Sequence, residues 1–421
     1  MSGTTPVLAE ESPSGPVPIT GTLRRLLWWL LPANASVFLL WGAIPGTLLA
    51  WQVQDLDAAN KEHNLAIVAT VGAIAALLAQ PIAGTVSDRT RSRLGRRAPW
   101  MIAGAVVGGL ALGAMALAPT VIVLAAAWTV AQIAFNFVQG PLSAVLPDRV
   151  PRSVRGSFSG VIGAGTMLGM TLGAVVGNAM QRSVPVAYLL LAAVVIAVMV
   201  VFVVANPDRP STGDRSEPFR LGTFLRTFWV SPTRHPDFFF AFSGRFLLNI
   251  GYNAVTQYQV YLLQDYIGLS RDAAAGLAIV LSGIAAAVIT VTTLLLGRLS
   301  DRVGRRKIFV FGSSVTIAIA LAIPWLSPTV PAMFGYAVVM GIGFGAFQAV
   351  DTALISEVLP SAQDYGKDLG VVNIAATLPQ AVAPALAGAI VVGLGYAALF
   401  PFAIGVILLA SVAVFGIKSV R

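Results

Sequence analysis

The 421 residues are 57% hydrophobic and only 11% charged, whereas a soluble globular protein keeps about a quarter of its residues charged. The absence of cysteine excludes disulfides and thiolate metal sites. The formal net charge of +9 suggests a nucleic-acid partner at first sight, but the basic residues follow the pattern of membrane topology, so we expect no nucleic-acid binding.

The chain begins with a polar segment rich in Pro, Ser, Thr and Gly, which lacks the basic start and apolar core of a signal peptide. We expect residues 1–22 to form a disordered cytoplasmic tail. Beyond it, long stretches carry no charge, and a membrane-spanning helix needs about 20 mostly apolar residues. Single spans fit the stretches 26–54, 64–87, 156–181 and 183–207, two spans each fit 98–147, 308–350 and 369–417, and 238–264 and 273–297 add two more.

These segments predict an all-α membrane protein with twelve transmembrane helices in two pseudo-symmetric six-helix bundles. The expected bundles are residues 23–205 and 237–421, joined by a cytoplasmic linker over residues 206–236. If both termini lie inside, 23 of the 27 Lys and Arg fall on the cytoplasmic side. The positive-inside rule therefore predicts a multi-pass protein of the plasma membrane with both termini in the cytoplasm.

A repeat relates the two halves. The sequence GTVSDR at residues 84–89 returns as GRLSDR at 297–302, and VLP at 145–147 returns at 358–360, both at an offset of 213. Two motifs at one spacing indicate a parallel duplication, a plan in which the substrate site lies between two halves that rock against each other.

The loop SDRTRSRLGRRAPW, which starts at Ser87, and its shorter copy SDRVGRR, which starts at Ser300, resemble the signature loops of the major facilitator superfamily. The longer loop is also similar to the plant sucrose carriers and related glycoside-pentoside-hexuronide cation symporters. Their QGP and LGVLNLA…PQ segments resemble residues 139–141 and 369–380. Ser143 departs from this pattern, because the plant carriers have arginine there.

The resemblance implies that the two loops latch the halves together on the cytoplasmic side and open when the carrier turns inward. We expect Gly84 and Gly297 to allow close approach of a neighbouring helix, and Asp88 and Asp301 to pair with arginines. The alternative is that the arginines only contact lipid phosphates. The candidate gate residues are Gly84, Ser87, Asp88, Arg89, Gly95, Arg96, Arg97, Gly297, Ser300, Asp301, Arg302, Gly304, Arg305 and Arg306.

Two ionisable residues lie inside predicted spans, Arg245 and Asp351. Each is nine residues from a proline at the cytoplasmic end of its helix, so both lie about 13 Å deep, close to the membrane midplane. We predict that they form an ion pair, which either couples transport to H⁺ or Na⁺ or is purely structural. We expect no other cofactor and no metal site.

Neutral polar residues form stripes at helical spacing along several predicted spans. Amides and hydroxyls suit a polyhydroxylated ligand because amides both donate and accept hydrogen bonds, and the face of Trp41 could stack on a sugar ring. The alternative is hydrogen bonding between helices. The candidate substrate residues are Trp41, Asn136, Gln139, Ser143, Asn249, Tyr252, Asn253, Gln348, Asn373 and Gln380.

The glycine run Gly165, Gly169, Gly173 and Gly177 predicts a helix-packing ridge. An enzyme is not expected, because the two histidines, His63 and His235, have no partners at metal-ligand spacing. We therefore predict a monomeric secondary transporter that works by alternating access and takes up a sugar or glycoside with a proton or cation. The alternative is a proton-coupled efflux carrier for drugs or other amphipathic compounds.

Overall fold

The structure is a computed structural model that describes residues 18–212, 235–303, 306–357 and 365–417. Most of the predicted tail, the linker beyond residue 212, Gly304 and Arg305 lie outside these ranges, as do the side chains of Asp301 and Asn373. The described residues form helices throughout the membrane region. In the first half these are α1 (Gly21–Ala43), η1 (Ile44–Leu48), α2 (Leu49–Leu56), α3 (Lys61–Arg89), α4 (Ala98–Ala116), α5 (Val121–Arg149), η2 (Arg152–Val154), α6 (Arg155–Ala179) and α7 (Val184–Ala205).

The second half repeats this plan. Its helices are α9 (Pro236–Thr256), α10 (Gln259–Tyr261), η3 (Leu262–Tyr266), α11 (Arg271–Val303), α12 (Arg306–Leu326), α13 (Val330–Glu357), α14 (Tyr365–Leu394), η4 (Tyr396–Ala398) and α15 (Leu399–Phe415).

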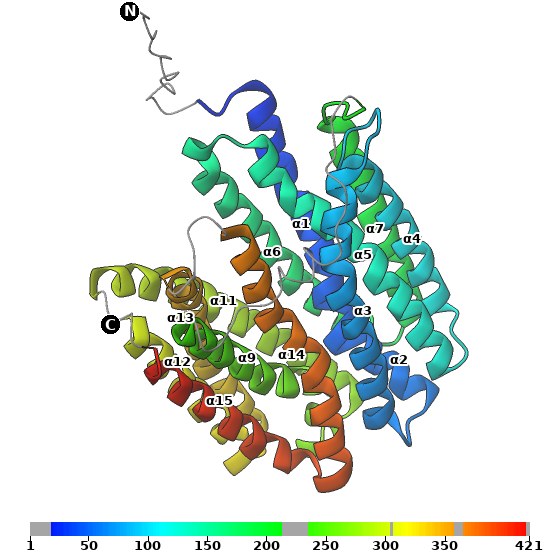
Figure 1. Cartoon of the computed structure of the whole chain (residues 1–421). Helices are drawn as coiled ribbons and strands as arrows, with labels where there is room; N and C mark the ends of the chain where they lie inside the picture. Colours follow the sequence, from blue (N-terminus) through cyan, green and yellow to red (C-terminus); the bar gives the residue numbers. More distant parts are fainter. Residues whose placement is uncertain (1–17, 213–234, 304–305, 358–364, 418–421) are drawn as a thin grey trace, which may run out of the picture.

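Eleven helices in the described ranges are long and apolar enough to cross a membrane. The helix α9 is also long enough, with 21 residues, but it is less apolar because it contains Arg245, Asn249 and Asn253. With α9 the fold has twelve membrane helices in two bundles, which confirms the predicted fold class. Figure 1 shows the bundles as a blue-to-green group and a green-to-red group.

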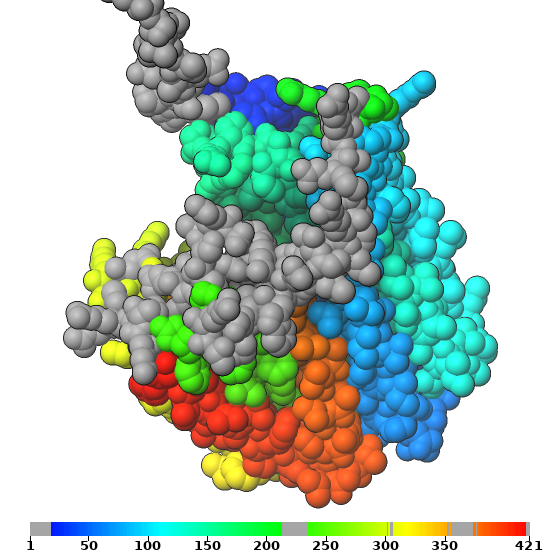
Figure 2. All heavy atoms as spheres, in the orientation of Figure 1, coloured from blue at the N-terminus to red at the C-terminus, as the bar shows by residue number. Residues whose placement is uncertain are grey.

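The two ends of the molecule differ in charge. The basic end holds the α3–α4 loop with its arginines and the start of the connection after α7. The far end holds the α2–α3 turn and the start of α11. At the far end the orange α14 lies against the blue α3 of the other half (Figure 2).

The packing of α1 on α6 depends on the predicted glycine ridge, which is confirmed. A Cβ atom added to Gly165, Gly169, Gly173 or Gly177 would lie less than 3.0 Å from an atom of α1 or η1. At the first three positions the nearest atom is a main-chain carbonyl oxygen. In lipid, van der Waals contact of this kind drives helix association, and only small residues allow it.

Hydrogen bonds between the halves concentrate at the far end. Gln257 Nε2 donates to the Pro45 carbonyl at 2.8 Å, and Tyr261 Oη donates to the Ala50 carbonyl at 2.6 Å. The side-chain amides of Gln54 and Gln264 also bond across the interface, at 3.2 Å. Pro45 belongs to the π-helical turn η1 and Gln264 to the π-helical turn η3, while Ala50 and Tyr261 belong to the helical segments α2 and α10 beside these turns.

Ion pairs also join the two halves at the far end. Arg271 pairs with Asp55, and its Nη2 lies 3.0 Å from Asp55 Oδ2. Arg182 pairs with Asp272 with the opposite placement of charge, the cation on the first half and the anion on the second. Between pairs of described residues, the bond nearest the basic end is that of Thr290 Oγ1 to Met167 Sδ at 3.3 Å, about halfway along α6. The structure is therefore closed at the far end.

Candidate substrate cavity and ion pair

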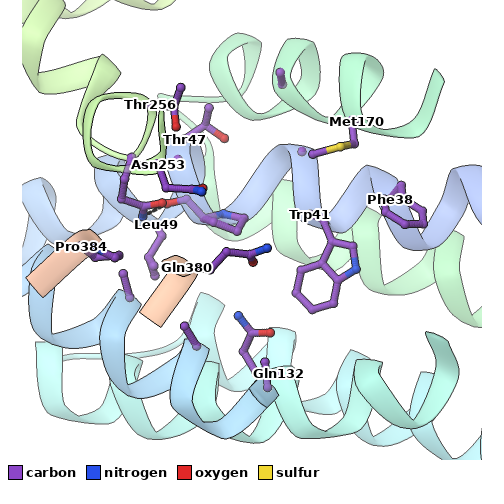
Figure 3. Close-up of a pocket in the computed structure, with 18 of the residues that line it drawn as sticks. Phe38, Trp41, Thr47, Leu49, Gln132, Met170, Asn253, Thr256, Gln380 and Pro384 are labelled. Atoms are coloured by element: carbon purple, nitrogen blue, oxygen red, sulfur yellow. Dashed lines mark hydrogen bonds between the residues drawn. The ribbon is translucent and has the colours of Figure 1, made fainter. Parts of the chain in front are cut away.

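A cavity of about 500 Å³ lies between the two halves, within the volume range typical of small-molecule sites. Its wall comes from α1, η1, α2, α3, α5 and α6 on one side and from α9, α10, α11 and α14 on the other. Figure 3 shows Trp41, Gln132, Asn253 and Gln380 pointing into this space from both halves.

None of the described residues that line the cavity carries a charge. Nine of them are amides, namely Gln80, Gln132, Asn136, Gln139, Asn178, Asn253, Gln257, Gln259 and Gln380. Such a wall can donate and accept many hydrogen bonds. It offers no counter-ion to a charged ligand, which would have to lose its hydration without compensation.

Trp41 is held in place by the wall of the first half. Its Nε1 donates to Gln139 Oε1 at 3.0 Å, and its ring meets those of Trp128 and Phe135 edge-on, at centroid distances of 6.4 and 6.5 Å. The bond occupies the Gln139 oxygen and leaves its NH₂ group free to donate elsewhere. Trp41 thus presents a fixed aromatic face to the cavity (Figure 3), and the Gln139 amide lies beside it.

Two buried amide oxygens in the wall lack hydrogen-bond donors among the described residues, Gln132 Oε1 and Asn178 Oδ1. The two residues are only 7% and 1% exposed. The Asn178 NH₂ group donates one of its two hydrogens to the Ala174 carbonyl at 2.9 Å. An unsatisfied buried acceptor costs about 1–3 kcal/mol.

The predicted substrate residues divide according to depth. Trp41, Asn136, Gln139, Tyr252, Asn253 and Gln380 line the cavity. Ser143 and Asn249 do not. Ser143 Oγ bonds to the Gly140 carbonyl at 2.8 Å and Asn249 Nδ2 to the Arg245 carbonyl at 2.8 Å. Gln348 is exposed and lies outside the lining.

Other lining residues were not among the predicted ligands. Gln132, Thr256 and Thr377 belong to the same helical stripes as the predicted residues, so the stripe spacing could have found them. Asn178 follows the last glycine of the α6 ridge, and Gln257 follows the end of α9. Gln257 is four residues after Asn253 and Asn178 is three residues before Gln181, so helical spacing could have marked both.

The two intramembrane charges lie together. Arg245 Nη1 of α9 is 2.9 Å from Asp351 Oδ2 of α13, and the side chains are 20% and 9% exposed. Both residues belong to the second half, and neither lines the cavity. Arg245 Nε is buried without an acceptor among the described residues, so the guanidinium binds the carboxylate through one nitrogen and retains an unused donor.

At the basic end Arg97 joins three helices of the first half. It is 7% exposed, and its Nη2 lies 2.5 Å from Asp88 Oδ1 and 2.9 Å from Asp148 Oδ2. Its Nη1 donates to Ser87 Oγ at 2.7 Å. In this conformation the described partner of Asp88 is therefore in its own half.

The other gate residues are less enclosed. Arg89 and Arg306 each have a partner, Ser300 is buried, and Arg302 is exposed. The helix α5 approaches Gly84, since a Cβ at Gly140 would lie 3.6 Å from Gly84 N, but the missing side chains of Gly84 and Gly297 are not needed for close packing in this conformation. A Cβ at Gly84 would meet no atom within 4 Å, and one at Gly297 would be 3.9 Å from Ala349 Cβ.

The glycine that the loop requires is Gly95. It has a φ of +89°, and a Cβ there would lie 2.5 Å from Asp208 Cβ. Arg96 lines a second cavity at this end with Arg97, Arg149 and Asp208. The residues after α7 thus pack on the α3–α4 loop, where Ser211 N also donates to the Ser92 carbonyl at 3.1 Å.

Two helical bundles around a shared central cavity define a membrane transporter for a small molecule. The sequence matches the Major Facilitator Superfamily over residues 30–335 and again over residues 272–420. The chain belongs to this superfamily, and it is a multi-pass transporter and not an enzyme.

Relatives by sequence include a general alpha-glucoside permease of Schizosaccharomyces pombe, 27% identical over 172 residues. A sucrose transport protein of Arabidopsis thaliana, SUC4, is 28% identical over 195 residues. The matches cover 34% and 40% of this chain, and 31% and 38% of the relatives, so the chain spans well under half of their lengths. The crystal structure of a mutant nucleoside transporter, NupG, shares the fold, with a TM-score of 0.76, 16% identity, and coverage of 93% of this chain and 99% of that one.

Proposed function

We propose that the protein is an alternating-access carrier that takes up an uncharged, polyhydroxylated solute of the α-glucoside or sucrose class. The observation that carries this proposal is the wall of amides and hydroxyls without a charged residue among the described lining positions. A sugar hydroxyl both donates and accepts, so one ligand can bond to several amides of the wall, among them the NH₂ group of Gln139.

The aromatic face of Trp41 supports the same ligand class. Its indole is fixed by Gln139 and by two neighbouring rings, so a sugar ring can stack on it with little loss of side-chain entropy. The two sequence relatives are named for an α-glucoside and for sucrose, although each match covers only part of the chain. A nucleoside also presents hydroxyls and a ring, and it belongs in any substrate panel.

The orientation follows from the arginines. We place the basic end in the cytoplasm of a cell with this protein in its plasma membrane, because positive loops remain inside. With this placement the far end faces outward, and its closure separates the cavity from the outside of the cell.

For coupling we propose Asp351. Protonation of its carboxyl would release Arg245, and the lone guanidinium would favour a different packing of α9 against α13. The ion pair supports this role because a single proton on Asp351 would remove the charge that holds Arg245 at 2.9 Å. A cation such as Na⁺ is the other candidate for the coupling ion.

The test is counterflow in proteoliposomes that contain the purified protein. We expect labelled sucrose or an α-glucoside to exchange against the same unlabelled sugar, and amphipathic dyes not to exchange. A pH gradient should drive net accumulation. The variant Asn178→Leu should lose exchange, whereas Gln348→Leu, an exposed amide outside the lining, should retain it. Exchange of dyes without exchange of any sugar would favour the efflux carrier instead.

A further inference from the structure

A cluster of ionisable side chains closes the far end beside α14, away from the cavity and from Asp351. The hydroxyl of Tyr396, in η4 of the second half, lies 2.7 Å from Glu62 Oε1. The same hydroxyl lies 3.0 Å from Asp265 Oδ2. Glu62 belongs to the first turn of α3 in the first half, and Asp265 belongs to η3 in the second. One phenol oxygen therefore joins two carboxyl groups across the boundary between the halves.

The two oxygen–oxygen contacts of Tyr396 need two hydrogens, and the phenol supplies only one. A phenol has one O–H, and an ionised carboxylate can only accept hydrogen bonds. If both carboxyls were ionised, one of the two close oxygen–oxygen contacts would contain no hydrogen and would be repulsive. One additional proton on a carboxyl completes both bonds, because that carboxyl donates to the phenol oxygen while the phenol donates to the other carboxylate.

The surrounding charges indicate which carboxyl holds the proton. Lys61 Nζ lies 2.7 Å from Asp265 Oδ2, and this lysine is 11% exposed. The ammonium group thus gives the Asp265 carboxylate a cation partner, which Glu62 lacks among the described residues. The main-chain carbonyl of Glu62 accepts from Tyr258 Oη at 3.0 Å. We propose that closure of the far end binds one proton on Glu62, and that this proton joins the two halves through Tyr396 and Asp265.

The other groups around Glu62 have partners of their own. Tyr261, whose ring lies 4.9 Å below Lys61 Nζ, donates to the Ala50 carbonyl. Asp55 pairs with Arg271, and Asp57 accepts from Asn60 and Asn64. His63 is exposed. On the side of α14, Gly388 packs next to Ala66 and Tyr258, and this contact contains no charged side chain. The extra proton is thus confined to Glu62, Tyr396 and Asp265.

The direction of the pH effect follows from linkage. The closed far end binds one proton more than the open far end, so closure is favoured at low pH and weakens as the pH rises. Linkage of one proton changes the closed-to-open ratio about tenfold per pH unit over the titration range. This property belongs to the empty carrier. It does not depend on the solute, the coupling ion or the role of Asp351, and it goes beyond the proposed function.

The experiment measures the distance between the halves at the far end. Because the natural chain has no cysteine, spin labels can be placed at Leu117→Cys and Leu326→Cys without other changes. These two exposed leucines lie at the far ends of α4 and α12, one in each half. Pulsed dipolar spectroscopy on the labelled carrier in nanodiscs, without solute, then gives the closed and open populations at a series of pH values.

We expect the short-distance population to fall as the pH rises. Glu62→Gln should remain closed at every pH, because its NH₂ group donates to Tyr396 permanently. Tyr396→Phe keeps the ring and should remove the pH response. Asp55→Asn is the matched control. It removes a different ion pair between the halves, and should weaken closure while leaving the pH response intact.

Infrared difference spectroscopy supplies a second measurement. A protonated carboxyl band should appear in the low-pH state of the natural chain and be absent from Glu62→Gln. The proposal is overturned if the distance distribution of the natural chain does not change with pH, or if Glu62→Gln keeps the natural pH response. The first result would leave the tests of sugar transport and of Asp351 unaffected.

Discussion

Arg245 Nη1 and Asp351 Oδ2 lie 2.9 Å apart inside the second half, and neither residue lines the central cavity. The helix α9 carries Arg245 and, two turns further along, the lining residues Tyr252 and Asn253. A change in the ion pair can therefore reach the cavity through one rigid helix. This arrangement separates the position of the ion from that of the solute while keeping them mechanically connected.

The substitution Asp351→Asn should separate transport from its driving force. The amide cannot take up or release a proton, so solute should still exchange in counterflow but should not accumulate under a pH gradient. Asp57→Asn, in the α2–α3 turn, serves as the control and should accumulate solute normally. Accumulation by Asp351→Asn at the natural level would exclude coupling through this residue.

Removal of the arginine alone should destabilise the protein. Arg245→Gln leaves the buried Asp351 carboxylate without a cation, and breaking a buried pair in this way costs about 3–5 kcal/mol. We expect a lower midpoint in thermal unfolding of the purified carrier. The double variant with Asp351→Asn should recover much of the loss. Equal midpoints for Arg245→Gln and the natural chain would show that the pair contributes no stability.

Gln139→Leu should weaken solute binding. The change leaves Trp41 Nε1 without its acceptor and removes one amide donor from the wall. Loss of a buried hydrogen bond of this type costs about 1–3 kcal/mol, so we expect Kd to rise about tenfold or more. Ser143→Ala, one helical turn further along α5, lies outside the lining and should leave Kd unchanged. Tryptophan fluorescence titration would measure both.

The glycine ridge gives a matched pair of variants within α6. Gly169→Ala places a methyl group against the Ala35 carbonyl of α1, whereas Gly163→Ala points into open space. Overpacking costs about 1–3 kcal/mol, so the first variant should unfold at a lower temperature than the natural chain and the second should not. If both variants unfold alike, close contact between α1 and α6 does not contribute to stability.

Sequence analysis predicted the fold well because hydropathy and the internal repeat are properties of the chain itself. The depth argument brought Arg245 and Asp351 to one level, and the structure places them in contact. The cavity was predicted less completely, because a stripe of polar residues defines a helix face but not the depth at which a cavity begins. Gln139 lines the cavity and Ser143 does not; Asn253 does and Asn249 does not.

These two pairs have a common physical explanation. In each pair the residue outside the lining is one turn closer to the basic end, and one turn is about 5.4 Å of helix. The cavity lies towards the closed far end, and which end is closed depends on the packing of the halves. The contacts that close it, such as Tyr396 with Glu62, join residues 334 positions apart in sequence and belong to no recognisable motif.

The most direct test of the central claim compares two solutes of the same shape in counterflow, a methyl α-glucoside and the corresponding methyl α-glucuronide. They differ only in a carboxylate, and the described cavity wall has no cation to compensate for it. An uncharged amide-lined site predicts exchange of the glucoside and rejection of the glucuronide. Equal exchange of both, or exchange of the glucuronide alone, would contradict the proposal that this carrier selects an uncharged polyhydroxylated solute.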